Sequence, residues 1–115
     1  MISVPFEIAE VHGGLSEAKG IVLVEDNFVV FQLQMTTLGM FKREPEIIKI
    51  EIAAIDEMRL EKRLFSDRLY IRPKRMKLLE VMPGKHGLEV KLKVRKRHRR
   101  SALVLVDSVR RRKRI

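Results

Sequence analysis

Residues 88–95 read LEVKLKVR, and this stretch indicates the fold more clearly than any other part of the chain. Apolar and charged residues alternate along it, so that four apolar side chains share one face: Leu88, Val90, Leu92 and Val94. A period of two is typical of a β-strand with one face in the core and the other in solvent. We therefore expect a strand over 88–95, with Leu88 as its first inward residue.

The same alternation recurs from the start of the chain to residue 72. It predicts six further strands, at 4–8, 18–25, 28–35, 47–52, 57–62 and 68–72. Asp26 and Asn27 link two of them, and a two-residue link of these types favours a hairpin because both residues tolerate positive φ. Pro73 ends the strand before it because proline has no N–H to donate to a neighbouring strand.

The period changes at the end of the chain. Four apolar residues there follow one another at i, i+3, i+4 and i+7, which is one face of a helix: Ala102, Leu105, Val106 and Val109. We expect a helix over 99–112 that packs against the strands. About seven strands and one helix predict a single mainly β (α+β) domain, residues 1–112, with a basic tail at 110–115.

Three stretches of this pattern are similar to one known family. They are GIVLVEDNFVVFQ (20–32), KIEIAAIDEMRLEKRLFSDRLYI (49–71), and LEVKLKV (88–94) running into RRSALVLVDSVR (99–110). On these residues the chain resembles the bacterial PH-like and GRAM-like domains, over about residues 4–112. The resemblance implies a partly open antiparallel β-barrel of about seven strands, closed at one end by the C-terminal amphipathic helix.

The family's lipid site is not carried over to this chain. Lipid-binding members hold several basic residues around the first hairpin loop, whereas HGGLSEAKG (12–20) offers only His12 and Lys19, with Glu17 among them. Many eukaryotic members also carry a tryptophan in the closing helix, and this chain has none. The resemblance therefore predicts a binding module without naming its ligand.

The formal charge of +10 is concentrated at one end of the chain. Residues 91–115 contain 12 of the 25 basic residues and a single acid, Asp107, which gives +11. Residues 1–90 contain the other 13 basic residues against 14 acidic ones, which gives −1. A surface adapted throughout to a polyanion would not divide in this way.

Catalysis and metal binding are not expected. The chain has no cysteine, which removes thiolate metal sites and cysteine nucleophiles. The three histidines, His12, His86 and His98, fall in different predicted elements and do not have the spacing of metal ligands. We expect a non-enzymatic protein with no catalytic residues, no metal and no cofactor.

Two basic clusters are candidates for binding anionic membrane lipids. One is a predicted loop with four cations: Arg72, Lys74, Arg75 and Lys77. The other is the end of the chain: Arg110, Arg111, Arg112, Lys113 and Arg114. Such clusters attract anionic head groups, and they also bind nucleic acid without sequence preference. The alternative is that both are solvated. A third basic run, at 95–100, lies where the last strand becomes the helix.

An apolar loop is the candidate for contact with a protein. Met35, Met40 and Phe41 flank or lie within TTLGMFKREPE (36–46), and methionine suits adaptable contacts with another chain. The alternative is that Met40 and Phe41 fold back over the edge of the sheet. A protein partner or a homo-oligomer is our first expectation, an anionic membrane the second, and non-specific nucleic-acid binding the third.

The sequence favours a cytoplasmic protein, with peripheral attachment to the membrane as the alternative. The first residues, MISVPFEIAEV, lack the basic segment of a secretory signal. The longest unbroken apolar run, Ala102–Val106, is far shorter than the ~20 residues of a membrane-spanning helix.

Overall fold

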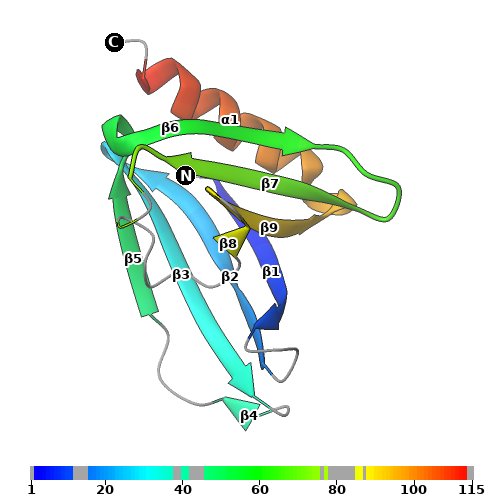
Figure 1. Ribbon diagram of the computed structural model, residues 1–115. Coiled ribbons are helices and arrows are strands. Elements are labelled where there is room, and N and C mark those ends of the chain that lie inside the picture. Colours follow the sequence, from blue (N-terminus) through cyan, green and yellow to red (C-terminus); the bar gives the residue numbers. More distant parts are fainter. Residues whose placement is uncertain are drawn as a thin grey trace.

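In the computed structural model of the protein, seven long strands form one strongly curved antiparallel sheet, and a helix ends the chain (Figure 1). The structure describes residues 2–11, 16–37, 40–41, 46–75, 77, 85–86 and 88–113. Within these ranges, residues 9–11, 16–17, 35–37, 40–41 and 85–86 are described by their backbone alone.

The elements follow one another in the order expected from the sequence. The long strands are β1 (Ser3–Val11), β2 (Ser16–Glu25), β3 (Phe28–Thr37), β5 (Glu46–Glu51), β6 (Ile55–Glu61), β7 (Ser66–Pro73) and β9 (Glu89–Arg95). Two short strands, β4 (Met40–Phe41) and β8 (Lys85–His86), flank β3 and β9. Two 3-10 turns, η1 (Ile52–Ala54) and η3 (Lys96–His98), precede β6 and the helix α1 (Arg99–Lys113).

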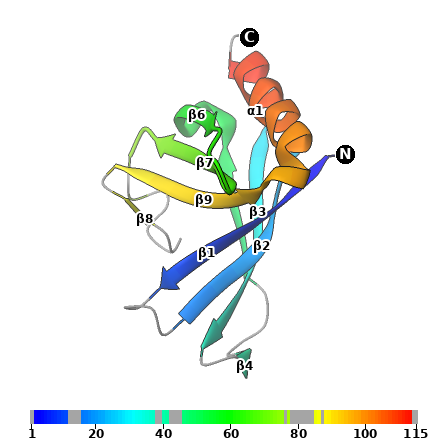
Figure 2. The same cartoon turned by 90° about the vertical axis from the view of Figure 1, so that its right-hand side faces the viewer.

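The sheet has the strand order β5-β3-β2-β1-β9-β7-β6, with antiparallel neighbours throughout. Strands β1, β2, β3 and β5 form one half, and β9, β7 and β6 run across them as the other half (Figure 2). The two edge strands, β5 and β6, are consecutive in the chain through η1, but in the described residues they do not pair. The predicted mainly β fold is confirmed, and the sheet is not closed into a barrel.

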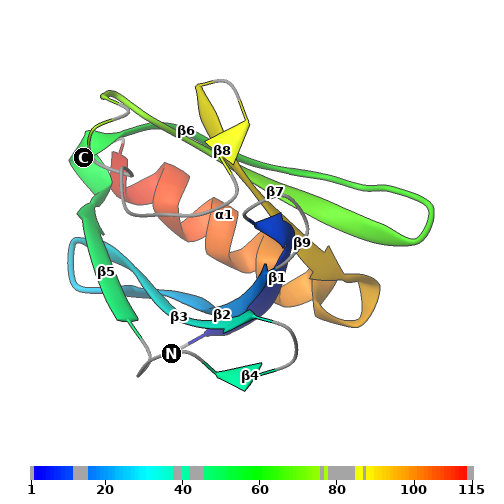
Figure 3. The ribbon, with the colours of Figure 1, turned by 60° about the horizontal axis from the view of Figure 1, so that its bottom comes forward.

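The seam between the halves is narrow. Strand β1 pairs with β2 along most of its length, whereas its register with β9 consists of Glu7 opposite Lys93. Helix α1 crosses this seam, because it contacts β1 and β2 on one side and β6 on the other (Figure 3). The helix therefore joins the two halves as well as covering the open end between them.

The predicted helical face is confirmed. Its four apolar residues are all buried against the strands: Ala102, Leu105, Val106 and Val109. They complete a core that contains the inward side chains of both halves, including Phe6 and Phe31, whose rings meet edge to face at 6.4 Å. Burial of such apolar surface is the main favourable contribution to folding.

Strands β2 and β3 show one predicted turn and one close approach of their backbones. The Asp26-Asn27 link forms the expected β2–β3 hairpin, with Asp26 at φ 55°, a conformation that Asp tolerates better than most residues. Gly20 lies where β2 is pressed against β3. A Cβ at this position would lie 1.9 Å from the carbonyl oxygen of Gln32, so a side chain there would force the two strands apart.

One prediction about the face of a strand is wrong. Leu88 is 69% exposed rather than inward, because β9 begins one residue later, at Glu89. On β7, Tyr70 is buried because the Arg59 guanidinium lies over its ring at 4.3 Å from the centroid.

Candidate anion-binding surface

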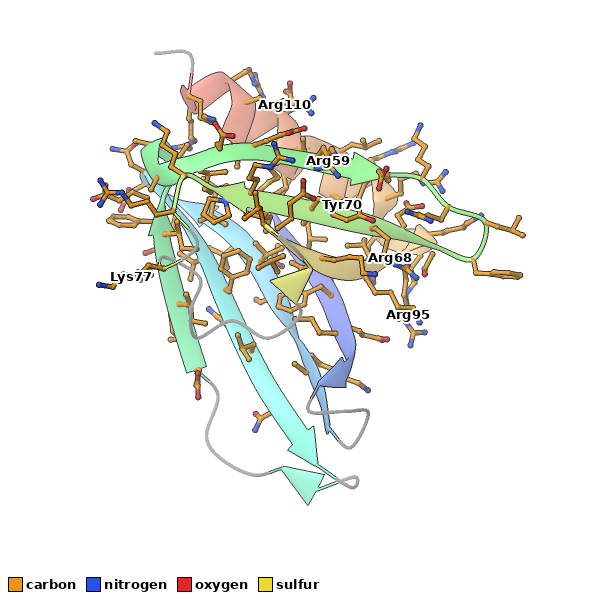
Figure 4. The ribbon with its side chains drawn as sticks, viewed as in Figure 1. Arg59, Arg68, Tyr70, Lys77, Arg95 and Arg110 are labelled. Atoms are coloured by element: carbon orange, nitrogen blue, oxygen red, sulfur yellow. The ribbon has the colours of Figure 1, made fainter. Side chains whose placement is uncertain are left out.

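The first predicted basic cluster, 72–77, is divided by the structure. Arg72 belongs to β7 rather than to a loop, and its Nη2 lies 2.7 Å from Oε1 of Glu89. Lys74, Arg75 and Lys77 are exposed, and within the described residues none of the three has an acidic partner. Figure 4 places Lys77 and Arg95 at opposite ends of the molecule.

The outer face of β6, β7 and β9 holds Glu89 between two arginines. Arg59 Nη1 and Arg72 Nη2 lie 2.9 and 2.7 Å from the same carboxylate oxygen. The hydrogen bond from Arg59 lowers the pKa of Glu89 below its ordinary value, although burial acts in the opposite direction. Glu89 lies on β9, and its two partners come from β7 and from β6 beyond it. Their side chains cover the Glu89 carboxylate, which is why it is buried. Arg72 is therefore part of a structural ion-pair network, and its role as an anion-binding residue stays a prediction.

The C-terminal basic cluster also makes contacts within the protein. Arg111 Nε lies 3.0 Å from Oδ2 of Asp107, one helical turn earlier. Arg112 donates to the carbonyl oxygen of Asp26, and Lys113 Nζ donates to that of Asp56 at 2.6 Å. The end of the helix is thereby tied to the β2–β3 turn and to the start of β6.

These contacts bring together two clusters that the sequence keeps apart. Lys74, Arg112 and Lys113 line one shallow hollow beside η1. Arg110 is exposed and, among the described residues, has no acidic partner, whereas Arg114 lies outside them. We call residues 74–77 and 110–113 the helix end.

The third basic run lies beside a hollow on the outside of the sheet. Lys93 and Arg95 on β9 and Arg97 in η3 line a hollow of about 240 Å³ beside β1, together with Lys19 from β2. The adjacent Lys96 is exposed. We call these five residues the basic strip: Lys19, Lys93, Arg95, Lys96 and Arg97.

One carboxylate stands in the hollow among these cations. Glu7 accepts two hydrogen bonds from Arg95, at 3.1 and 2.9 Å. Lys96 and Arg97 have no salt-bridge partner in the part of the chain that the structure describes. The strip therefore keeps an excess of positive charge that no carboxylate of the described residues neutralises.

A buried ion pair fixes the start of α1 relative to the β6–β7 hairpin. Asp67, whose side chain is 0% exposed, accepts Arg99 Nε at 2.7 Å on one oxygen and Arg99 Nη2 at 2.8 Å on the other. The backbone N–H of Arg63 donates to the same carboxylate at 3.1 Å. The hydrogen bonds from Arg99 hold the pKa of Asp67 below its ordinary value, although its burial raises it.

The tip of the β6–β7 hairpin carries two exposed apolar side chains that the sequence reasoning missed. Leu64 is 75% exposed and Phe65 is 88% exposed. In Figures 1 and 3 this hairpin projects to one side of the molecule, the side where β9 ends. The signal in the sequence was an apolar pair inside a predicted turn, with basic residues before it.

The predicted interaction loop is only partly described. Met35 lies in β3, and Met40 and Phe41 form β4, which pairs with Thr36 and Thr37 of β3. Their side chains are outside the described residues, so their role as a contact surface stays a prediction. Nearby on β5, Ile47 is 64% exposed.

Metal and membrane-spanning sites are not found in the described residues. No group of three or more His, Asp or Glu side chains there could hold a metal ion. No helix in the same ranges is long and apolar enough to cross a membrane. His98 accepts a hydrogen bond from Arg97 Nε at 3.2 Å, His86 is described by its backbone alone, and His12 lies outside the described residues.

Comparisons of the chain with protein-family models, with curated proteins and with solved structures find no match. The PH-like and GRAM-like resemblance therefore stays a prediction. The function has to be inferred from the surface itself.

Proposed function

We propose that the protein is a non-catalytic binding module of PH-like type that attaches to an anionic partner through the basic strip. The observation that supports this most directly is the run of seven cations without an acid between Lys91 and Arg100. In the folded chain three of these cations, Lys93, Arg95 and Arg97, line the hollow that Lys19 also lines. A partner with several negative charges would bind there and release its counterions.

The order of the elements supports the PH-like part of the proposal. Two sheet halves that meet at a narrow seam, with a C-terminal helix across the open end, agree with the architecture that the resemblance implies. The strip lies on the outer side of that seam. The ligand thus contacts the scaffold without entering its core.

The test is a titration with a heparin fragment at several salt concentrations. The strip variant reverses two charges, Lys96→Glu with Arg97→Glu. It should bind at least about tenfold more weakly, because each lost charge-assisted contact removes a favourable contribution to the binding free energy. It should also flatten the dependence of affinity on salt. The matched control, Lys74→Glu with Arg75→Glu, changes the net charge equally at the helix end and should weaken binding much less.

Three outcomes separate the alternatives. A larger loss in the strip variant supports a located binding surface. Equal losses in both variants would mean that only the net charge matters, and the strip would not be a site. Absence of binding by the unmodified protein would overturn the proposal.

Self-association is a second candidate, favoured by one observation on β5. This strand pairs only with β3 in the described residues, so its other edge is open, and the exposed Ile47 lies on it. An open edge with an apolar side chain is suited to pairing with the same strand of a second copy. The predicted loop residues Met35, Met40 and Phe41 are in the elements beside it.

Sedimentation velocity distinguishes this candidate from the electrostatic one. A dimer that persists at about 1 M salt, where charge interactions are screened within about 3 Å, and that is lost in Ile47→Lys would support it. A monomer at every concentration would exclude it.

A further inference from the structure

The tip of the β6–β7 hairpin, residues 62–65, combines features that the rest of the described surface does not. Leu64 and Phe65 are adjacent in the chain and are the two most exposed large apolar side chains described, at 75% and 88%. Residues of this kind normally pack against the body of a protein. An exposed apolar pair at a projecting tip indicates a contact made outside the molecule.

The hairpin holds these side chains away from the core. The N–H of Arg63 donates to Asp67, and the same carboxylate is fixed by Arg99 at the start of the helix. Ser66 stands opposite Arg95 in the β7–β9 pairing, and this is the last pair of those two strands. Residues 62–65 therefore extend beyond the paired part of β7 and β9. Because these contacts fix the base of the turn, Leu64 and Phe65 are presented outward in a defined orientation.

Four basic residues lie next to the tip in the chain or at the base of its hairpin. Lys62 and Arg63 precede the apolar pair, and Lys96 and Arg97 follow the strand that is paired with the base of the hairpin. Arg63 has a weak partner in Glu61, at 3.5 Å, whereas Lys62, Lys96 and Arg97 have no acidic partner among the described residues. An apolar tip with cations at its base is complementary to a surface that is apolar inside and anionic outside.

We propose that this tip inserts Leu64 and Phe65 into the interface of an anionic bilayer, while Lys62, Lys96 and Arg97 contact the lipid head groups. The inference rests on the proposed function, because part of the basic strip supplies the charge. It adds a membrane as the partner and an inserted element as the means of attachment. The predicted lipid-binding clusters at 72–77 and 110–114 are then not the contact surface.

The shape of the tip favours a bilayer over a protein. A convex turn with two apolar side chains would require a partner with a matching pocket, whereas a bilayer interface admits apolar side chains to a depth of about 5–10 Å without one. The basic residues lie behind the tip, at the level where head groups would meet them. Attachment by both signals is stronger than attachment by either one.

Flotation with vesicles tests the inference. The vesicles are phosphatidylcholine with about one fifth phosphatidylserine, at the physiological ionic strength of about 0.15 M. The full chain should float, and Leu64→Ser with Phe65→Ser should lower the partition coefficient at least about tenfold for each side chain. The matched control is Leu103→Ser with Val104→Ser, an adjacent pair on the helix that is 42% and 40% exposed. It should float like the unmodified protein.

A fluorescent reporter gives a second measurement that does not depend on losing binding. The chain has no tryptophan, so Phe65→Trp introduces a single probe at the tip. Its emission should shift to the blue on adding vesicles and should be quenched by brominated lipid. Leu103→Trp, placed on the helix, should show neither effect.

The outcomes separate this inference from the proposed function. If the protein floats but the tip variant floats equally, or the Phe65→Trp emission does not change on bound vesicles, insertion is wrong and attachment is electrostatic. If the protein binds heparin but does not float, the membrane is not the partner and the proposed function stands. If it does neither, both proposals fail.

Discussion

Two ends of this molecule are basic, and they differ in what their cations contact. At the helix end, Arg111, Arg112 and Lys113 reach an acid and two backbone carbonyls of the same chain. At the opposite end, which we call the hairpin end (residues 62–65 and 95–99), Arg99 has a buried partner. Lys62, Lys96 and Arg97 there have no acidic partner among the described residues.

The difference shows that charge density in a sequence does not tell which cations the fold leaves without a partner. The run RRRKR at 110–114 is the densest in the chain, yet three of its described members stabilise the fold. The hairpin end has fewer consecutive cations but places them beside exposed apolar side chains. The combination of free charge and exposed apolar surface is therefore more informative than the number of basic residues.

The helix that joins the two ends should show the largest effect on stability. Leu105 is 2% exposed, and Leu105→Ala should lower the free energy of unfolding by about 2–5 kcal/mol because it leaves a cavity. Val104→Ala, on the exposed face of the same helix, should cost less than about 0.5 kcal/mol. Urea denaturation measures both, and equal losses would contradict the assigned helical face.

The buried ion pair of the hairpin end should come next. Arg99→Ala leaves the Asp67 carboxylate without its bidentate partner, and we expect a larger loss of unfolding free energy than an exposed ion pair contributes. The loss is limited because the Arg63 N–H still donates to Asp67. Urea denaturation at neutral pH checks this, and a loss below about 1 kcal/mol would place the pair among ordinary surface ion pairs.

The same pair predicts how stability depends on pH. The pKa of Asp67 is lowered from 3.8 in the folded state, so its ionisation stabilises the fold fully above that value. The contribution is lost as the pH falls through the folded-state pKa. The difference in unfolding free energy between the protein and Asp67→Asn should thus be constant near neutral pH and shrink below about pH 4.

Denaturation in a series of buffers measures that difference. Glu89, whose pKa is also lowered, is present in both proteins, so its contribution cancels in the comparison. A difference that stayed constant to the most acidic buffer in which the protein folds would exclude Asp67 as its source.

The smallest effect should be at the helix end. Arg111 and Asp107 form an i, i+4 pair with side chains 67% and 64% exposed, and Arg111→Ala should cost only about 0.3–0.5 kcal/mol. Added salt should remove even this difference, since exposed charges are screened. An effect as large as that of Arg99→Ala would erase the contrast between the ends.

The strands and the helix could be predicted from the sequence because their patterns are local. The alternation in 88–95 and the spacing of Ala102, Leu105, Val106 and Val109 each report one face of one element. The Asp26-Asn27 turn depends on two adjacent residues. All of these are confirmed, apart from the position of Leu88, which lies one residue before its strand.

The candidate surface could not be predicted in the same way because its contacts are distant in the chain. Glu89 is buried by Arg59, 30 residues away, and Arg112 reaches the carbonyl of Asp26, 86 residues away. No local pattern distinguishes these arginines from solvated ones. Likewise, the exposure of Leu64 and Phe65 follows from the projection of the hairpin, which depends on the packing of the whole sheet.

The narrow seam between β1 and β9 has a consequence for how the molecule opens. Each half of the sheet is held by extensive pairing of its own strands, whereas the halves meet at the register pair of Glu7 and Lys93, the ion pair of Glu7 with Arg95, a common apolar core and the helix that crosses them. Detachment of α1 would open that core to solvent, so we expect amide protons on both sides of the seam to exchange once the helix is released. The fifteen residues of α1 therefore link the stability of one half of the sheet to that of the other.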